Sequence, residues 1–162
     1  MAVNEVLVGL DNSPSAKAAL HWAAQYARAG NLSLKAVHVY QQTYIPVVAS
    51  TGLLVTEYML DEESRELTRA TMQGIFVTVE PEPTWRLELV DGPIGHELVS
   101  RAADARLLVI GTREHTGVGR IVKGSVSHYC LSHTACPVVA VPAPTKRSGK
   151  QHRNHSPAVG VS

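Results

Sequence analysis

Apolar residues recur along this chain with two periods, and each period predicts a different kind of element. Runs of mainly apolar residues predict strands at 3–10, 32–40, 85–90, 107–111 and 137–141. Apolar positions spaced three and four apart predict helices from 14 to 29, from about 56 to 74, from 93 onward and from 125 to 133. Residues 41–55 follow neither period, and Pro46 and Gly52 predict a loop there that covers part of the molecule.

The first helix has the clearest boundaries. Ser13 is the expected N-cap and Pro14 the first helical residue, while Gly30 and Asn31 end the helix. Small and apolar residues are expected to form its inward face: Ala16, Ala19, Leu20, Ala23, Ala24 and Ala27.

The next two helices have simpler inward faces. The second is expected to turn three residues toward the core, which are Leu60, Leu67 and Met72. In the third, Ile94, Leu98 and Ala102 share a face. Glu97 and Arg101 are one helical turn apart there, and we expect them to form an ion pair.

Strands alternate with helices throughout the chain, and the first, fourth and fifth strands are apolar along their length. This is typical of a parallel sheet whose two faces are both covered by helices. The sequence therefore predicts a doubly wound α/β fold, a five-stranded parallel sheet with helices on both faces, similar to the Rossmann arrangement. After Pro142 large apolar residues become scarce, so residues 1–142 are expected to form one domain and residues 143–162 a disordered basic tail.

The composition is that of an ordinary globular protein, with 162 residues, 44% hydrophobic, 18% charged and a net charge of +1. So small a charge gives no general attraction to nucleic acid or membranes, and no apolar run approaches the ~20 residues of a membrane span. The N-terminus enters an apolar strand almost at once, so we expect no signal segment and a cytoplasmic location. In a reducing cytoplasm Cys130 and Cys136 are expected to be buried small hydrophobes rather than a disulfide or a metal pair.

Residues 107–127 carry the strongest functional signal. After the apolar strand comes a glycine-rich segment, with Gly111 first and Gly117 inside it, and the segment ends at Gly124 and Ser125, where a helix starts. It holds four potential cations, which are Arg113, His115, Arg120 and Lys123. Glycine lets backbone approach a ligand, and the free amides at a helix start favour phosphate. The spacing matches neither Walker A nor Gly-x-Gly-x-x-Gly, so both a phosphate site and a plain connection remain open.

The predicted topology adds a second signal. In an open α/β sheet ligands bind beyond the carboxyl ends of the strands, where the winding direction reverses. If the first strand neighbours the fourth, Asp11 comes close to Gly111 and the start of the basic loop. The end of the second strand, at Val39 and Tyr40, would then flank the crevice and could supply an apolar wall for a base.

These residues resemble the universal stress protein family over residues 3–141. The first strand followed by Asp11-Asn12-Ser13 is similar to the family's opening, and the second strand ends like the family's at 36–39. The family's nucleotide motif is glycine, two residues, glycine, nine residues, then glycine with Ser or Thr. Gly111 takes the first position and Gly124-Ser125 the last. The end of the domain, at 136–141, is also similar.

The resemblance implies the family's fold, which is Rossmann-like and of the adenine nucleotide alpha hydrolase type. It also implies binding of ATP with Mg²⁺ and a homodimer joined through the fifth strands. In the ATP-binding branch the aspartate after the first strand lies by the nucleotide and its metal, which here points to Asp11 as the metal residue. The positions carried over from the family motif are Asp11, Val39, Gly111, Gly124, Ser125, Val126 and Ser127. With Arg113, Glu114 and Gly117 of the loop they form the expected nucleotide site.

The chain departs from the family motif at its middle glycine, which is Glu114 here. A carboxylate ~6 Å from a phosphate charge costs about 3 kcal/mol at an effective dielectric near 20. That would weaken binding about a hundredfold unless it is offset. The neighbouring cations could offset it, Glu114 could turn to solvent, or its carboxylate could help hold Mg²⁺.

Three functions follow. The first is a regulatory, non-catalytic ATP-binding module of stress response or signalling, with an as yet unidentified protein partner. The second is an interaction module of the same family in which Glu114 has abolished the nucleotide site. The third is a slow ATPase, for which the sequence offers only Asp11 as a base and no P-loop lysine.

Overall fold

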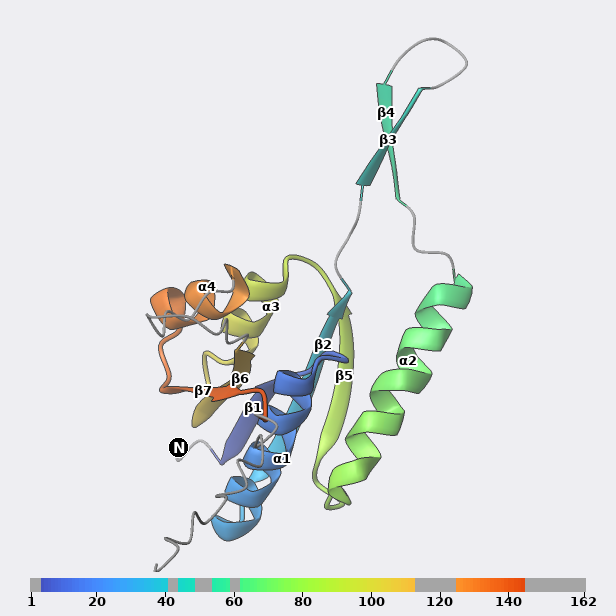
Figure 1. Cartoon of the computed structure of the whole chain (residues 1–162). Coiled ribbons are helices and arrows are strands. Elements are labelled where there is room, and N and C mark those ends of the chain that lie inside the picture. The colour runs from blue at the N-terminus through green and yellow to red at the C-terminus, as the bar shows by residue number, and fades with distance from the viewer. Residues whose placement is uncertain (1–3, 41–43, 49–53, 59–61, 113–124, 145–162) are drawn as a thin grey trace, which may run out of the picture.

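The computed structural model describes residues 4–40, 44–48, 54–58, 62–112 and 125–144. In these segments it contains β1 (Glu5–Gly9), α1 (Pro14–Ala29), β2 (Ser33–Tyr40), β3 (Tyr44–Val48), β4 (Leu54–Tyr58), α2 (Glu62–Phe76), the 3-10 turn η1 (Val77–Val79), β5 (Arg86–Asp91), α3 (Ile94–Arg101), β6 (Leu107–Thr112), α4 (Ser125–His133) and β7 (Val138–Pro142) (Figure 1). None of the helices in these segments has the length and apolar character needed to cross a membrane.

The main sheet has five parallel strands in the order β5-β2-β1-β6-β7. From β1 the chain winds toward β2 and β5, and it then returns across the sheet to β6 and β7. Helices α1 and α2 lie on one face and α3 and α4 on the other (Figure 1). The predicted doubly wound α/β fold is therefore confirmed, with β1 next to β6 at the reversal of winding.

Helix α1 follows its sequence signals closely. It begins at Pro14, and the Ser13 side chain accepts a hydrogen bond from the Ala16 amide, as an N-cap should. Gly30 caps its C-terminus. All six expected inward residues are buried against β1, β2 and β6, and five of them have small side chains that let the helix lie close to the sheet: Ala16, Ala19, Leu20, Ala23, Ala24 and Ala27.

Within residues 41–55 the described segments, 44–48 and 54–55, lie in strands rather than in the expected loop, so the prediction was wrong for them. Strands β3 and β4 pair antiparallel from Tyr44↔Tyr58 to Val48↔Leu54 and form a separate two-stranded ribbon. Figure 1 shows this hairpin standing away from the body of the molecule. Pro46 was interpreted as a loop residue, but a two-stranded ribbon has an outer edge on each strand, and proline is tolerated at such an edge.

The second helix was also predicted with a wrong start. Because β4 continues to Tyr58, α2 begins at Glu62 rather than near Thr56. Met72 is buried as expected, but Leu67 is 70% exposed, and Leu60 lies outside the described residues. Only the C-terminal half of α2 packs on the core, and Leu67 lies about 140° around the helix axis from Met72.

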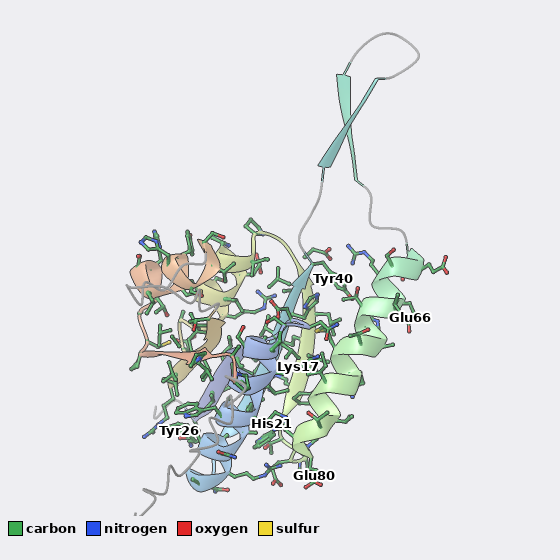
Figure 2. All side chains as sticks on the ribbon, in the orientation of Figure 1. Lys17, His21, Tyr26, Tyr40, Glu66 and Glu80 are labelled. Atoms are coloured by element: carbon green, nitrogen blue, oxygen red, sulfur yellow. The ribbon has the colours of Figure 1, made fainter. Side chains whose placement is uncertain are left out.

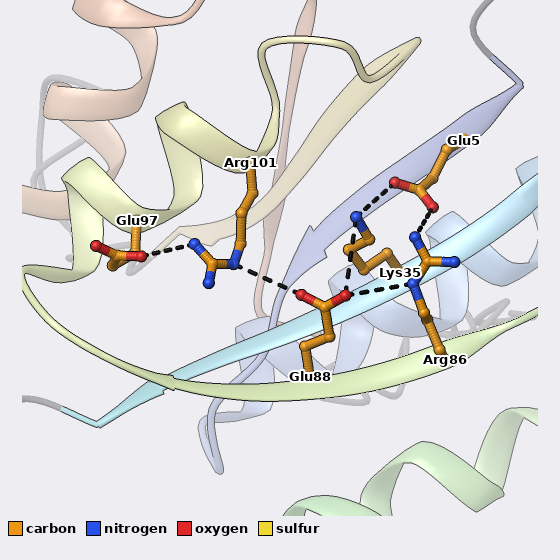
Figure 3. Close-up of polar contacts among 6 residues, drawn as sticks. All are labelled: Glu5, Lys35, Arg86, Glu88, Glu97 and Arg101. Atoms are coloured by element: carbon orange, nitrogen blue, oxygen red, sulfur yellow. Dashed lines mark hydrogen bonds and ion pairs between the residues drawn. The ribbon is translucent and has the colours of Figure 1, made fainter.

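A network of ion pairs covers the amino-terminal half of the sheet on the α3 side (Figure 3). Lys35 on β2 lies 2.9 Å from Glu5 and 3.9 Å from Glu88. Arg101 on α3 lies 3.5 Å from Glu88 and 2.6 Å from Glu97, which confirms the predicted helical pair. Charged side chains thus join β1, β2, β5 and α3 on this face of the sheet.

Candidate functional site

The carboxyl edge of the sheet brings together segments that are far apart in the sequence. Strands β1 and β6 are parallel neighbours, with Val6 opposite Leu107 and Val8 opposite Val109. The turn after β1 and the end of β6 therefore emerge at the same edge, which is the condition on which the predicted crevice depended. β2 lies on the other side of β1 and ends at Tyr40.

Asp11 forms the turn that leads into α1. Its side chain is exposed, and its Oδ1 accepts a hydrogen bond of 2.7 Å from the Ser13 amide. Ser13 in turn caps the helix, and its Oγ lies 3.2 Å from the Ser15 Oγ. This turn fixes the Asp11 carboxylate at the edge of the sheet, beside the positive end of the α1 dipole.

Gly111 is inside β6 and lies against the first turn of α1. A Cβ at this position would lie 2.6 Å from the Ala16 nitrogen and 2.6 Å from the Ser15 carbonyl carbon. Those are backbone atoms, so only a residue without a side chain allows this approach. The sequence predicted that the backbone at Gly111 approaches a ligand closely. In the structure it closely approaches the backbone of helix α1.

The first turn of α4 meets Gly111 from the opposite face of the sheet. The Ser127 hydroxyl donates a 3.4 Å hydrogen bond to the Gly111 carbonyl, and Ser127 is only 6% exposed. Ser125 begins the helix and is exposed, while Val126 is half-buried. The amino-terminal turns of α1 and α4 thus both contact one residue at the end of β6.

Val39 lies near the end of β2 on the α3 and α4 side of the sheet. It is 6% exposed and belongs to a core cluster against which Val90, Ile94 and Val126 also pack. Val39 and Val126, two residues of the predicted site, therefore line the same apolar cluster.

Tyr40 lies on the opposite face and joins β2 to α2 (Figure 2). Its hydroxyl donates to the Arg65 carbonyl, the Arg65 guanidinium lies 4.8 Å from the centre of its ring, and Arg65 also pairs with Asp91. Burial raises the pKa of Tyr40, and the cations Arg69 and Arg65 partly oppose the shift. This cluster fixes the ends of β2 and β5 at the carboxyl edge.

The predicted apolar wall of Val39 and Tyr40 was wrong for Tyr40, which faces α2 on the other side of the sheet. Sequence reasoning missed Ser15, Thr112 and the contacts of Tyr40 with α2. Ser15 is 4% and Thr112 8% exposed, and both lie beside the Gly111 contact. The sequence signal that could have indicated Ser15 is the pair of adjacent small residues, Ser15 and Ala16, at the start of α1. In the structure this pair faces Gly111. Four predicted site residues lie outside the described residues and cannot be placed, namely Arg113, Glu114, Gly117 and Gly124.

Comparison with known proteins gives a consistent result. The family model of the universal stress proteins matches residues 3–142. Universal stress protein Rv2623 of Mycobacterium tuberculosis is 30% identical over 147 residues, a match that covers 84% of this chain and 46% of that protein. Universal stress protein YxiE of Bacillus subtilis is 28% identical over 145 residues, covering 85% of this chain and 98% of that protein. The chain thus spans about half the length of the mycobacterial relative.

Solved structures agree on the fold. Universal stress protein UspA from Lactobacillus plantarum superposes with a TM-score of 0.62 at 22% identity, covering 87% of this chain and 99% of that chain. A universal stress protein in complex with cAMP superposes with a TM-score of 0.59 at 21% identity, covering 89% of this chain and all of that chain. An Arabidopsis thaliana family member with AMP bound gives 0.56 at 16% identity, covering 91% and 97%. On the family match and the fold together, this chain belongs to the universal stress protein family.

Proposed function

We propose that this chain binds ATP together with Mg²⁺ at the carboxyl edge of its sheet and acts as a regulatory module rather than an enzyme. One observation carries the proposal: the first turns of α1 and α4 both contact Gly111 at the end of β6. The first amides of α4 have no partner within the helix, and α1, whose Ala16 amide is capped by Ser13, contributes the positive end of its dipole. Two helix starts at one edge therefore favour a polyphosphate.

Asp11 is the proposed metal residue. Its carboxylate is exposed at the same edge, and it follows the strand next to β6. Mg²⁺ is commonly held by one or two carboxylates together with substrate phosphates and water. No group of three acidic, histidine or cysteine side chains within the described segments could hold a metal alone. Asp11 with the phosphates is the arrangement that these residues offer.

The nucleotide base is assigned to the apolar side of the crevice. Val39 and Val126 pack on one cluster next to the end of β2, and Ser125 and Ser127 are assigned to the ribose and phosphates. Structures of similar fold have been solved with cAMP, with dAMP in an Archaeoglobus fulgidus protein and with AMP, so adenine nucleotides are the ligand class that these comparisons support.

The loop residues Arg113, Gly117 and Gly124 complete the proposed site, and Glu114 modulates it. If Glu114 faces the phosphates, Glu114→Gly tightens ATP binding by as much as a hundredfold, because it removes a repulsion of about 3 kcal/mol. Isothermal calorimetry with Mg-ATP measures the change. An unchanged affinity would show that this carboxylate faces away from the phosphates.

The decisive experiment is mass spectrometry of small molecules released from the purified, denatured protein, followed by calorimetry with Mg-ATP. The matched variant is Asp11→Asn, whose side-chain oxygen can still accept from the Ser13 amide while the charge is lost. We expect bound adenine nucleotide in the parent and a weaker dependence of affinity on Mg²⁺ in the variant. A parent that carries no nucleotide and ignores Mg-ATP would instead support the interaction module, and multiple turnovers of ATP would support the ATPase.

The assembly is proposed from the position of β7. This strand forms one edge of the sheet, and its residues are half-buried or exposed, so a second copy could pair with it. We therefore propose a cytoplasmic homodimer joined through β7, in which nucleotide binding alters the contacts made with a protein partner. The domain is proposed to comprise residues 1–142, with residues 143–162 as its tail.

A further inference from the structure

Two free cysteines flank the connection from α4 to β7. Cys130 is in α4 with no exposed surface, and it belongs to the cluster beneath α3 and α4. Cys136 precedes β7, is half-buried and packs against the same cluster. Both thiols therefore lie on one side of the sheet, at the end of one helix.

Thr134 contacts both cysteines. Its amide donates a 3.1 Å hydrogen bond to the Cys130 carbonyl, which ends the helix. Its hydroxyl oxygen accepts a 3.4 Å hydrogen bond from the Cys136 amide and lies 3.4 Å from the Cys136 Sγ. The connection thus folds back around Thr134 and returns Cys136 toward the helix turn that carries Cys130.

The two thiols differ in accessibility. Burial raises the pKa of Cys130 to about 11, and the nearby Cys136 contributes to the shift. Cys130 is therefore a protonated thiol at neutral pH and is closed to solvent. Cys136 is the more exposed of the two residues, and we therefore assign it the reaction with a dissolved oxidant.

We propose that Cys136 and Cys130 are a peroxide-reactive pair that closes an intramolecular disulfide. Cys136 attacks a hydroperoxide, takes one oxygen to become a sulfenic acid and releases water when the oxidant is hydrogen peroxide. Cys130 then gives up its proton, its sulfur bonds to that of Cys136, and the sulfenic oxygen leaves as a second water. Two thiols and one hydrogen peroxide thus yield one disulfide and two waters. The second step is the slow one, because the Cys130 thiol is buried and holds its proton.

The disulfide would join the end of α4 to the start of β7. The same helix begins at Ser125 and places Ser127 against Gly111, so oxidation restrains the element that forms one side of the candidate site. The chemistry does not depend on nucleotide binding, and its test uses no nucleotide.

The test treats the reduced full-length chain with hydrogen peroxide and follows intact mass and non-reducing digests. We expect loss of two hydrogen atoms within the single peptide that contains both cysteines. In Cys130→Ala the reaction should stop at a sulfenic acid on Cys136, which dimedone traps, and Cys136→Ser should leave Cys130 unreacted. Sulfenic acid in the parent that never converts to the disulfide, a disulfide between two chains, or oxidation of Cys130 alone would each overturn the proposal.

A measurement on the unmodified chain guards against a variant that fails to fold. Under native conditions a limited amount of iodoacetamide should alkylate Cys136 before Cys130. Alkylated chains should then lose the ability to form the disulfide. Equal labelling of both cysteines, or disulfide formation that survives labelling of Cys136, would also overturn the proposal.

Discussion

Gly111→Ala should destabilise this fold, because the new methyl group has no space. Its Cβ would lie 2.6 Å from two backbone atoms of the first turn of α1 and 2.8 Å from the Ser15 carbonyl oxygen. Backbone on a packed helix cannot retract as a flexible side chain can, so β6 and α1 must separate. Overpacking of this kind costs about 1–3 kcal/mol. For a domain near this size, a loss of ~2 kcal/mol lowers Tm by roughly 4–8 °C.

Gly74→Ala is the matched control, since it adds the same methyl group to the same residue type. Gly74 is exposed in α2, and a Cβ there would meet nothing within 4 Å. Alanine in a helix interior is favoured over glycine by about 0.5–1 kcal/mol, so this variant should become more stable. The two substitutions should therefore shift the free energy of unfolding in opposite directions.

Urea unfolding followed by circular dichroism measures both changes. The midpoint should fall for Gly111→Ala and rise for Gly74→Ala, with the denaturant dependence unchanged in both. If the two variants behave alike, or if Gly111→Ala is as stable as the parent, the close packing of β6 on α1 is wrong.

Three further predictions concern other parts of the molecule. The pKa of Cys130, about 11 against an ordinary 9.0, means that the folded state keeps a proton that the unfolded state loses, so the free energy of unfolding should fall between pH 9 and pH 11. Cys130→Ala should remove that part of the pH dependence. Lys35→Met should lower the free energy of unfolding, measured in urea, by about 1–3 kcal/mol, because the Lys35 side chain is 14% exposed between Glu5 and Glu88. A decrease below ~0.5 kcal/mol would mean that the network is no stronger than an exposed ion pair. Replacing residues 44–58 by a short Gly-Ser linker should change stability by less than ~1 kcal/mol, since β3 and β4 form a separate sheet that stands away from the body (Figure 1). A larger loss would show that the hairpin supports the body.

The parallel sheet could be predicted because its elements carry strong local signals. Ser13 and Pro14 mark the start of α1, and the alanine stripe that follows fits only a helix lying close on a sheet. β1 and β6 are apolar over most of their length because both of their faces are covered. Such signals come from burial itself, so they appear directly in the order of residue types.

The hairpin and the start of α2 could not be predicted for the opposite reason. β3 and β4 form a two-stranded sheet of their own, away from the strands and helices whose packing gives the main sheet its apolar pattern (Figure 1). Helix α2 is held at its amino-terminal half by the polar contacts of Arg65 with Tyr40 and Asp91, and such contacts leave no apolar periodicity. Leu67 was assigned inward with Met72, but it lies on another side of the helix and is 70% exposed.

Gly111 shows why a motif alone cannot separate binding from folding. The sequence assigns this glycine to a close approach between backbone and phosphate, whereas the structure gives it a close approach to the backbone of α1. Gly111→Ala would therefore reduce ligand binding even if the glycine never touched a nucleotide, because it displaces the first turn that carries Ser15 and Ala16. Asp11→Asn keeps the turn and removes only the charge, so a loss of Mg²⁺-dependent affinity in that variant cannot be explained by misfolding. The aspartate, and not the glycine, is the residue whose substitution tests the proposed function.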